Sequence, residues 1–417
     1  MAARRPAVQA PAKTPTKIPN TAISKTAKAV AKVAPSPRPC VDMQAARKAL
    51  VLQGGGALGS YQAGVYEALS RRGIHPEWVA GVSIGAINAA LIAGNAPNRR
   101  VERLREFWSL VSSAPAQRIP LAFGDRSTQN QWSANAAVMF GIPGFFRPSG
   151  SPLLLMGNAS PELSYYDTTP LRQTLERLVD FDRINAGEMR FSVGAANVVS
   201  GDSKYFDNTD PDTKIGPEHV MASGALPPGF PPVQVDKQFY WDGGIVSNTP
   251  LQYVLDAQSH KEALVVWQVD LFSARGAMPT TMSEVMERQK DITYSSRTRR
   301  NTDALASNLN LQQAIADLIG KLPPALRNDP SVAAVQAQLT HQPIDIFHLI
   351  YRDKPYETES KDYEFSRATV EDHWAAGLRD MEQTLAHPES LRSEAQTNGV
   401  TTFDLTEPGN ERVERPI

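Results

Sequence analysis

The segment Val79–Ala90 constrains the fold of this chain more than any other stretch. Its apolar start predicts a buried strand and its Ala- and Ile-rich second half predicts a helix, joined through Gly81-Val-Ser83-Ile-Gly85 in a G-x-S-x-G pattern. A serine at such a sharp corner needs glycine two residues to either side, because a Cβ there would collide with neighbouring backbone. The corner lifts the hydroxyl off the sheet edge, where the amides of the following helix favour negative charge. Ser83 is therefore a candidate nucleophile; the alternative is a serine that only caps the helix.

A second glycine-rich turn, Gly54-Gly-Gly-Ala-Leu-Gly59, follows a short apolar stretch that predicts another buried strand. The turn matches the G-x-G-x-x-G pattern of dinucleotide sites, which also require an acidic residue at the end of the second strand. Glu77 lies before that strand, so this reading is the weaker one. Two successive βα units of a parallel sheet bring both turns to one carboxyl edge. We therefore expect the amides of Gly55 and Gly56 to face Ser83, where they would stabilise an oxyanion.

A third turn supplies a carboxylate, because the aromatic strand predicted before Asp242 leads into Gly243 and Gly244. Asp-Gly is also a common structural turn, so the motif has meaning only if Ser83 lacks another base. A serine hydroxyl needs a base to react at neutral pH. None of the seven histidines lies in a recognisable loop signal, which favours a Ser83–Asp242 dyad. An aspartate with an ordinary pKa of about 3.9 is ionised at pH 7, so we expect contact geometry rather than a shifted pKa to serve the reaction.

Charge is distributed unevenly along the 417 residues. Residues 1–41 contain eight basic residues and no acidic one, and since the whole chain carries −1, the remainder carries −9. This balance argues against a nucleic acid partner for the folded body. The many prolines and lysines predict a disordered basic arm over residues 1–44 rather than an organelle transit peptide. Such an arm is a candidate contact with an anionic membrane surface.

Cysteine content and the lengths of the apolar runs constrain the cellular location that the sequence predicts. The single cysteine, Cys40, excludes an intrachain disulfide and fits a reducing compartment. No apolar run reaches the length of a spanning helix, and the N-terminus lacks the apolar core of a secretory signal. We therefore expect a cytoplasmic protein, peripheral to membranes at most.

Between the second and third turns, the segment Met139–Pro148 combines aromatic residues with glycine and proline, a composition that rarely forms regular structure. It is either a lid that contacts an acyl chain or a loop whose aromatics fill the core. The proline-dense segment Leu226–Pro232 predicts a rigid turn that can form a pocket wall.

Over residues 48–270 the chain resembles patatin-like phospholipases, because four motifs occur in the order seen in that family. They are Gly54–Gly59, Gly81–Gly85, Ala222-Ser-Gly-Ala-Leu-Pro227 with Phe230-Pro-Pro232, and Asp242-Gly243-Gly244. The resemblance implies an α/β fold in which a mostly parallel central sheet lies between two layers of helices. It implies that Ser83 is the nucleophile, Asp242 its dyad partner, and the turn Gly54, Gly55 and Gly56 the oxyanion hole. The implied reaction is hydrolysis of a fatty-acyl ester through an acyl-serine intermediate, without metal or cofactor.

Two positions depart from the family pattern. The glycine loop often carries Arg or Lys just before its last glycine, where this chain has Leu58, and it often begins after Asp, where this chain has Gln53. With no cation beside the predicted oxyanion hole, the preference for phospholipid headgroups and the rate of hydrolysis can differ from those of the family. The backbone amides that would donate to the oxyanion are still present.

Residues 276–390 resemble the C-terminal extension of one bacterial subgroup of these proteins. We divide the chain into the arm (1–44), an acyl hydrolase domain (45–275), a largely helical extension packed on that domain (276–390) and a polar tail (391–417), loose from Pro388. Within the extension, Ile344–Tyr351 predicts a strand and Phe365–Ala386 a helix with an apolar stripe. The charged surroundings of that stripe also suit a protein partner or self-association.

Three hypotheses for function follow. The first is a lipid acyl hydrolase with a Ser–Asp dyad; the second is an esterase or thioesterase with a histidine base, for which His260, His348 and His373 are candidates. The third is a non-enzymatic scaffold that acts through its C-terminal region, which predicts that an active-site serine probe labels nothing.

Overall fold

The computed structural model describes residues 46–114, 125–149, 163–258, 262–296, 298–339, 344–352, 357–387, 400–406 and 412–414. The chain divides into two units, Met1–Pro37 and Arg38–Ile417, and every described residue belongs to the second. The arm predicted over residues 1–44 lies outside the described residues.

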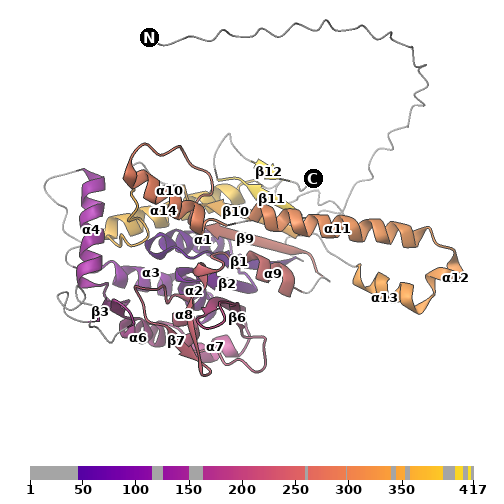
Figure 1. Ribbon diagram of the computed structural model, residues 1–417, viewed down its shortest axis with the longest axis horizontal. Coiled ribbons are helices and arrows are strands. Elements are labelled where there is room, and N and C mark those ends of the chain that lie inside the picture. Colours follow the sequence, from indigo (N-terminus) through magenta and orange to yellow (C-terminus); the bar gives the residue numbers. More distant parts are fainter. Residues whose placement is uncertain are drawn as a thin grey trace, which may run out of the picture. The chain divides into compact units, whose positions relative to one another are not determined.

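A mostly parallel sheet forms the centre of the second unit (Figure 1). Its order is β12-β11-β10-β9-β1-β2-β5-β8-β7, with β6 paired to β5. Pairing is parallel from β11 through β5 and antiparallel for β6, β7, β8 and β12. The strands are β1 (Arg47–Leu52), β2 (Trp78–Val82), β5 (Arg190–Asn197), β6 (Ser203–Asp207), β7 (Val233–Val235), β8 (Gln238–Asp242), β9 (Leu264–Asp270), β10 (Ile344–Ile350), β11 (Val400–Asp404) and β12 (Arg412–Glu414). The predicted fold class is confirmed.

Helices pack against both faces of this sheet, because side chains alternate between the two faces along each strand. Leu50 and Leu52 of β1 face a core shared with α1 (Ser60–Arg71), α2 (Ile84–Ala93), α3 (Arg100–Val111) and α14 (Arg367–Leu385). Ala49 and Val51 face the opposite core, which is shared with α9 (Leu251–Ala257). The strand-by-strand alternation thus builds three layers.

The remaining elements lie around these layers. They are the 3-10 turns η1 (Gly56–Gly59) and η3 (Gly243–Ile245), the short strands β3 (Arg147–Pro148) and β4 (Tyr166–Asp167), and the helices α4 (Arg126–Phe140), α6 (Thr169–Leu178), α7 (Phe181–Asn185), α8 (Pro217–Ser223), α10 (Met282–Tyr294), α11 (Thr298–Gly320), α12 (Pro324–Arg327) and α13 (Pro330–Gln338). Figure 1 shows α11, α12 and α13 extending away from the sheet. Within the described part of the chain, no helix is both long and apolar enough to cross a bilayer.

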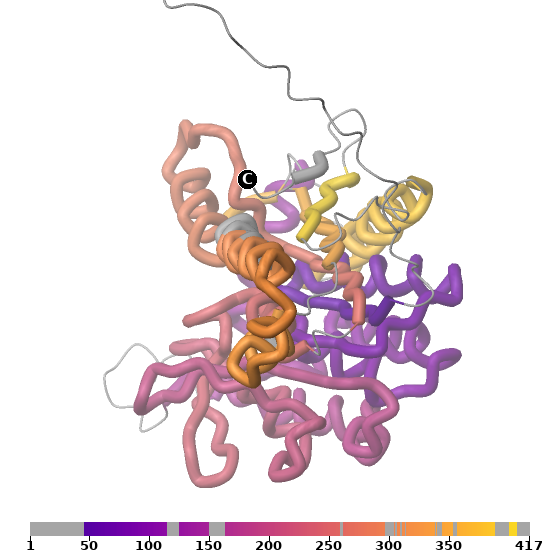
Figure 2. Tube along the Cα trace, turned by 90° about the vertical axis from the view of Figure 1, so that its right-hand side faces the viewer, coloured from indigo at the N-terminus to yellow at the C-terminus, as the bar shows by residue number. Residues whose placement is uncertain are grey.

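Helix α14 lies directly on α1, so two segments about 300 residues apart in the sequence pack against each other (Figure 2). Glycines face each other at the contact: a Cβ on Gly64 would lie 2.0 Å from the Trp374 carbonyl oxygen, and one on Gly377 would lie 2.0 Å from the Tyr61 carbonyl oxygen. The indole of Trp374 also donates to Glu67 at 2.7 Å. The predicted stripe on this helix is buried at Val370, Trp374, Met381 and Leu385.

The extension also contributes strands to the central sheet. The strand and helix predicted there are β10 and α14, and β10 pairs with β9 in parallel. The tail predicted to be loose from Pro388 differs from the structure, where β11 pairs in parallel with β10 and Val400 is 3% exposed. The short sequence Val-Thr-Thr-Phe gives too weak a pattern to predict a strand, and the partner edge of β10 decides its conformation.

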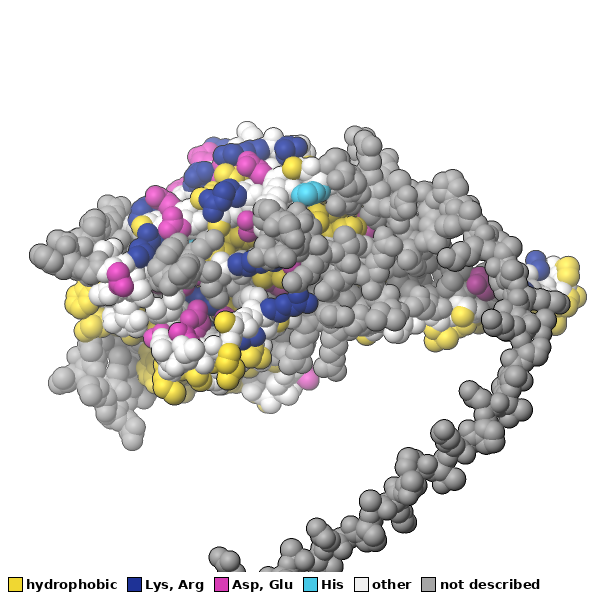
Figure 3. Space-filling view, turned by 90° about the horizontal axis from the view of Figure 1, so that it is seen from above, with side chains coloured by type: hydrophobic (Ala, Val, Ile, Leu, Met, Phe, Trp, Pro, Cys, Tyr) yellow, Lys and Arg dark blue, Asp and Glu magenta, His cyan; other side chains and the backbone are white. Residues whose placement is uncertain are grey.

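The surface face drawn in Figure 3 carries basic and acidic side chains interspersed with small hydrophobic groups over the part that the structure describes. Such mixing is the ordinary surface of a globular protein.

Candidate active site

Ser83 occupies the sharp corner between β2 and α2. Its backbone has φ 56° and ψ −124°, a left-handed region that costs a non-glycine residue about 1–3 kcal/mol. The flanking glycines are required as predicted: a Cβ on Gly81 would lie 2.3 Å from the Gly85 carbonyl oxygen, and one on Gly85 would lie 2.3 Å from that of Leu52. The Ser83 amide donates to the carbonyl oxygen and the hydroxyl of Ser223, at 3.1 and 3.0 Å. These two bonds hold the strained corner in place.

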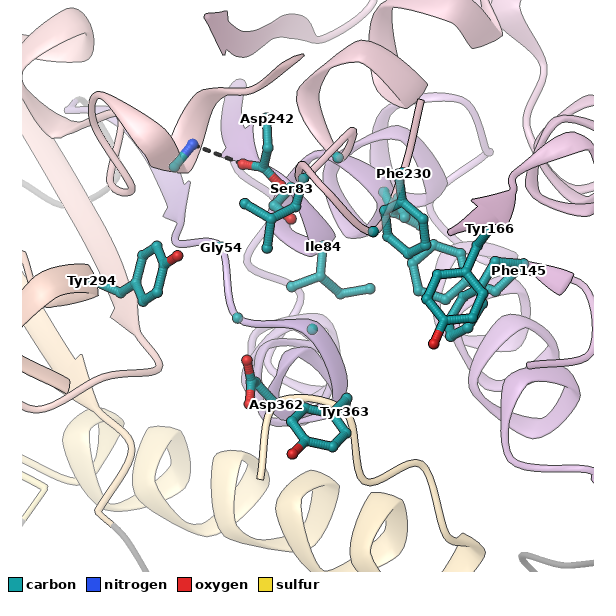
Figure 4. Close-up of a pocket in the computed structure, with 18 of the residues that line it drawn as sticks. Gly54, Ser83, Ile84, Phe145, Tyr166, Phe230, Asp242, Tyr294, Asp362 and Tyr363 are labelled. Carbon is teal, nitrogen blue, oxygen red and sulfur yellow. Dashed lines mark hydrogen bonds between the residues drawn. The ribbon is translucent and has the colours of Figure 1, made fainter. Parts of the chain in front are cut away.

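Asp242 lies at the end of β8 and is only 2% exposed (Figure 4). Its amide donates to the Ala225 carbonyl at 2.9 Å, and its Oδ1 accepts from the Gly244 amide at 2.7 Å. The Ser83 side chain lies beside the Asp242 carboxylate in the same cavity. The two motifs, 159 positions apart in the sequence, therefore meet.

Burial changes the acid strength of this carboxyl group. Loss of water raises the pKa of Asp242 from 3.8 to about 6, and the nearby Ser83 hydroxyl and Gly244 amide, which stabilise the charged carboxylate, offset only part of that rise. The sequence-based expectation of an ordinary pKa is wrong, because burial cannot be read from an Asp-Gly-Gly turn. A carboxylate with a pKa near 6 is a better proton acceptor than an exposed one and is still mostly ionised at pH 7.

The glycine turn lies beside the serine, because β1 and β2 are parallel neighbours with Leu52 opposite Gly81. A Cβ on Gly54 would lie 3.0 Å from the Cβ of Ser83 and 2.3 Å from Oδ1 of Asn248. The Gly54 amide already donates to the Asn248 carbonyl at 3.1 Å. Among the described residues, the amides of Gly55 and Gly56 have no such acceptor. This narrows the predicted oxyanion donors from three residues to two.

The outer glycines of the motifs serve close packing. A Cβ on Gly59 would lie 2.5 Å from the Ile84 side chain, and one on Gly243 would lie 2.5 Å from the Gly194 carbonyl oxygen. A Cβ on Gly244 would lie 2.7 Å from Oδ1 of Asn248. These contacts hold the three turns against one another.

Two side chains that the sequence analysis did not assign to the site join the three turns. The Asn248 amide group donates to the carbonyls of Gly54 and Tyr294, at 3.0 and 2.9 Å. Gln53 donates to Thr249 and Tyr294 and accepts from the amides of Leu271 and Phe272. An aspartate at position 53 lacks the two donors, so the departure from the family pattern has a structural consequence. Asn248 lies four residues beyond the Asp242-Gly243-Gly244 motif, and nothing local in the sequence marks it as a site residue.

A buried polar chain supports the glycine turn from behind. Gln62 donates to the Gln53 carbonyl at 2.6 Å and accepts from Asn88 at 2.9 Å, and Asn88 accepts from the Trp108 indole at 3.1 Å. Asn88 also donates to the Gly59 carbonyl. Every member of this chain has a partner, which makes a buried network rigid rather than costly. Leu58, at the position where the family often has a cation, is fully buried in the core beside it.

The serine and aspartate open into a cavity of about 330 Å³ (Figure 4). Its wall is largely apolar: Phe145, Phe146, Tyr166 and Phe230 form a cluster with ring centroids 4.8–6.1 Å apart. The core-filling reading of Met139–Pro148 holds for its two inner aromatic residues, and the lid reading stays a prediction. Phe145 and Phe146 are each 7% exposed and line the cavity, whereas Met139 and Phe140 point outward at 58% and 72% exposure.

Among the residues described, no histidine lines this cavity. His348 pairs with Asp270 at 2.6 Å, His373 pairs with Glu357 at 2.7 Å, and His219 accepts from the Gly216 amide. His260 and His341 lie outside the described residues. A histidine base for Ser83 therefore has no support in the described part of the chain.

The C-terminal extension completes the cavity wall. Tyr294, at the end of α10, lies on one side of it, and Asp362 and Tyr363 lie below the glycine turn (Figure 4). Phe365 also lines the cavity. The hydrolase domain expected from the motifs alone thus lacks one wall of its own pocket.

Comparisons with known proteins agree with this architecture. A family model described as "Patatin-like phospholipase" matches residues 50–255, and one described as "Patatin phospholipase" matches residues 292–397. No curated protein matches the chain. Among solved structures, VipD from Legionella pneumophila is 14% identical, with a TM-score of 0.31, over 82% of this chain and 72% of that one. ExoU in its complex with SpcU, from Pseudomonas aeruginosa, is 14% identical, with a TM-score of 0.26, over 84% of this chain and 78% of that one. Scores this low support no inference of their own, but the two family models together span most of the sequence from position 50 to 397. The chain belongs to the patatin-like phospholipase family.

Proposed function

We propose that this protein is a serine acyl hydrolase that cleaves fatty-acyl esters of lipids, with Ser83 as nucleophile and Asp242 as its base. The observation that carries the proposal is the position of Ser83 beside the buried Asp242 carboxylate in one cavity, next to Gly55 and Gly56, whose amides have no backbone acceptor among the described residues (Figure 4). Membership of the phospholipase family supports the same reaction class.

In the proposed mechanism Asp242 accepts the Ser83 proton as the hydroxyl oxygen attacks the ester carbonyl carbon. The Gly55 and Gly56 amides then donate to the oxyanion of the tetrahedral intermediate. Protonated Asp242 returns its proton to the departing alcohol, which leaves an acyl-serine. Water attacks that ester, Asp242 accepts the proton of the water, and the fatty acid leaves as the Ser83 hydroxyl is restored.

The cavity wall favours an acyl chain as the substrate group beyond the reacting carbonyl. Its aromatic cluster and the side chains of Ile84 and Ile87 offer apolar contact and few hydrogen-bonding groups. A volume of about 330 Å³ lies at the lower end of small-molecule pockets, which span roughly 300–1,000 Å³.

We further propose that substrate arrives from a lipid surface that meets the exposed apolar end of α4. Val138 lines the cavity and is 48% exposed, and Met139 and Phe140 continue the same apolar surface outward. An exposed apolar group at the mouth of an apolar pocket is a common docking feature for a hydrophobic partner.

A fluorophosphonate probe tests the assignment directly. We expect it to label the wild-type protein and not Ser83→Ala, and we expect Asp242→Asn to label far more slowly. Analysis of products from phospholipid vesicles should show free fatty acid from the wild type alone. Labelling that persists in Ser83→Ala would exclude Ser83 as the nucleophile, and a wild type that is never labelled would favour the scaffold hypothesis.

A further inference from the structure

The segment beyond the first family match touches the glycine turn itself. Residues 357–366, here called the extension loop, pass beneath η1, where the Asp362 carbonyl accepts from the Ala57 amide at 2.8 Å. A Cβ on Gly56, whose φ is +55°, would lie 2.0 Å from the same carbonyl oxygen. The backbone of the extension loop therefore lies in direct contact with the turn that carries the Gly55 and Gly56 amides (Figure 4).

Ion pairs in both directions hold the extension loop to α10. From the helix, Lys290 Nζ lies 2.6 Å from Asp362 Oδ1 and donates to the Glu359 carbonyl at 2.6 Å. From the loop, the fully buried Lys361 lies 2.7 Å from Asp291 and 3.2 Å from Glu287. Reciprocal pairs of this kind fix the register between two segments more tightly than a single pair does.

The other end of the glycine turn is braced by α10 as well. The Tyr294 carbonyl, at the C-terminus of α10, accepts from Gln53 at 3.1 Å and from Asn248 at 2.9 Å. The Asn248 carbonyl in turn accepts from the Gly54 amide. Helix α10 therefore supports the glycine turn at two places. Through Asn248 it supports Gly54, and through the Lys290–Asp362 pair it supports Gly56 and Ala57.

We infer that α10 and the extension loop form a clamp that positions the Gly55 and Gly56 amides, with Lys290 as its principal positioning residue. The inference rests on the proposed function, because the amides it concerns are the oxyanion donors assigned there. The physical reason is geometric: two glycines in succession have no side chains to fix the direction of their amides, so the backbone needs support from outside the turn. Asp362 supplies that support only while its own position is fixed by Lys290.

Lys290→Met is the first test, because it keeps most of the side-chain stem and removes both hydrogen bonds of the ammonium group, together with its contact over the Tyr363 ring at 5.3 Å. On a soluble short-chain nitrophenyl ester we expect kcat to fall about 10- to 100-fold while KM stays within about twofold, since the loss affects transition-state binding. Hydrogen–deuterium exchange in the peptide covering residues 53–59 should rise, because the Ala57 amide loses its fixed acceptor. Lys290→Arg should restore most of kcat, because the guanidinium also reaches the carboxylate.

Arg288→Met is the matched control. Arg288 lies on the same helix and donates to the Ser273 carbonyl at 3.0 Å, away from the extension loop. We expect Arg288→Met to lower the melting temperature about as much as Lys290→Met does, but to leave kcat unchanged. Asp362→Asn removes the same ion pair from the loop side and serves if Lys290→Met does not fold. The double variant Lys290→Met with Asp362→Asn should be no slower than the slower single variant, because both act through one contact.

Wild-type kcat in folded Lys290→Met or Asp362→Asn would overturn the clamp, as would a loss of kcat with unchanged exchange in residues 53–59. A wild type that neither reacts with the probe nor cleaves the ester would overturn the proposed function and, with it, the clamp. The two failures are therefore distinguishable by the wild-type measurement alone.

Discussion

Ser83 and Asp242 both occupy states that a residue chosen for stability would avoid. Ser83 has a backbone conformation that only glycine adopts freely, and Asp242 holds a charge in a site with 2% exposure. The hydrogen bonds that the Ser83 amide donates to Ser223 and that the Gly244 amide donates to Asp242 maintain these states. Residues of this kind are expected at reactive sites, where geometry and proton affinity matter more than local stability.

The raised pKa of Asp242 predicts how activity depends on pH. Because the proposed base must be ionised, kcat/KM should rise with pH and reach half its plateau near the pKa of about 6. A pH–rate profile between pH 4.5 and 8.5 on a soluble ester tests this. A midpoint near the ordinary value of about 4 would show that burial does not control the reacting group.

The same shift has a consequence for stability. Since the folded pKa of Asp242 lies above the unfolded one, its contribution is most favourable below pH 4 and is lost as pH rises through about 6. Asp242→Asn removes this pH dependence, because an asparagine side chain does not ionise. Relative to wild type, its free energy of unfolding should increase by roughly 1–2 kcal/mol between pH 5 and pH 7.5. Urea unfolding of both proteins at both pH values measures this.

At the scale of elements, the contact between α1 and α14 connects the segment that matches the first family model to the segment that matches the second. It is built on Gly64 and Gly377, each of which faces the backbone of the other helix. The Tyr61 hydroxyl donates to Asp380 at 2.7 Å across the same contact. Helices that approach this closely have no room for a methyl group between them.

Gly377→Ala should therefore destabilise the protein. Its Cβ would lie 2.0 Å from the Tyr61 carbonyl oxygen, and overpacking of this kind costs about 1–3 kcal/mol. Gly320→Ala is the control, because nothing lies within 4 Å of a Cβ at that helical position, and it should be neutral or gain up to about 1 kcal/mol. Thermal unfolding compares the two; equal effects would mean that the close helix contact does not exist in solution.

At the scale of the whole molecule, one sheet joins the two segments that match the family models, because β2 and β5 lie in the first segment and β10 lies in the second. Strands β9, β10 and β11 lie side by side in one sheet, although they come from residues 264 to 404. The extension also closes the cavity with Tyr363 and Phe365. Removing residues from 276 onward should therefore abolish activity rather than release an independent hydrolase.

The exposed end of α4 predicts a difference between lipid surfaces and dissolved substrates. Phe140→Asp places a charge at a position that is 72% exposed, so it should fold normally and keep its kcat/KM on a soluble short-chain ester. On phospholipid vesicles its rate should fall about tenfold, because a charge opposes burial in the interface. Val199→Asp, at a position that is 91% exposed, is the control and should leave both rates unchanged. Equal losses on both substrates would contradict surface docking at α4.

The sequence alone determined the chemistry that is available and the order of the elements that carry it. The glycines two residues to either side of Ser83 predict a sharp strand-to-helix turn, because a side chain at either position would collide with backbone. Short apolar runs such as Ala49–Leu52 predict buried strands of a parallel sheet. These features are local, so the fold class and the two motifs that meet could be predicted from the residues.

Tertiary structure decided what depends on distant partners. The pKa of Asp242 follows from burial, the roles of Asn248 and Gln53 from the turns between which they lie, and the strand at Val400–Asp404 from the open edge of β10. Lys290 and Asp362 lie 72 positions apart and carry no local signal, so their contact could not be predicted. Hydrogen bonds and desolvation depend on which groups are brought within a few ångströms, and packing over the whole chain sets those distances.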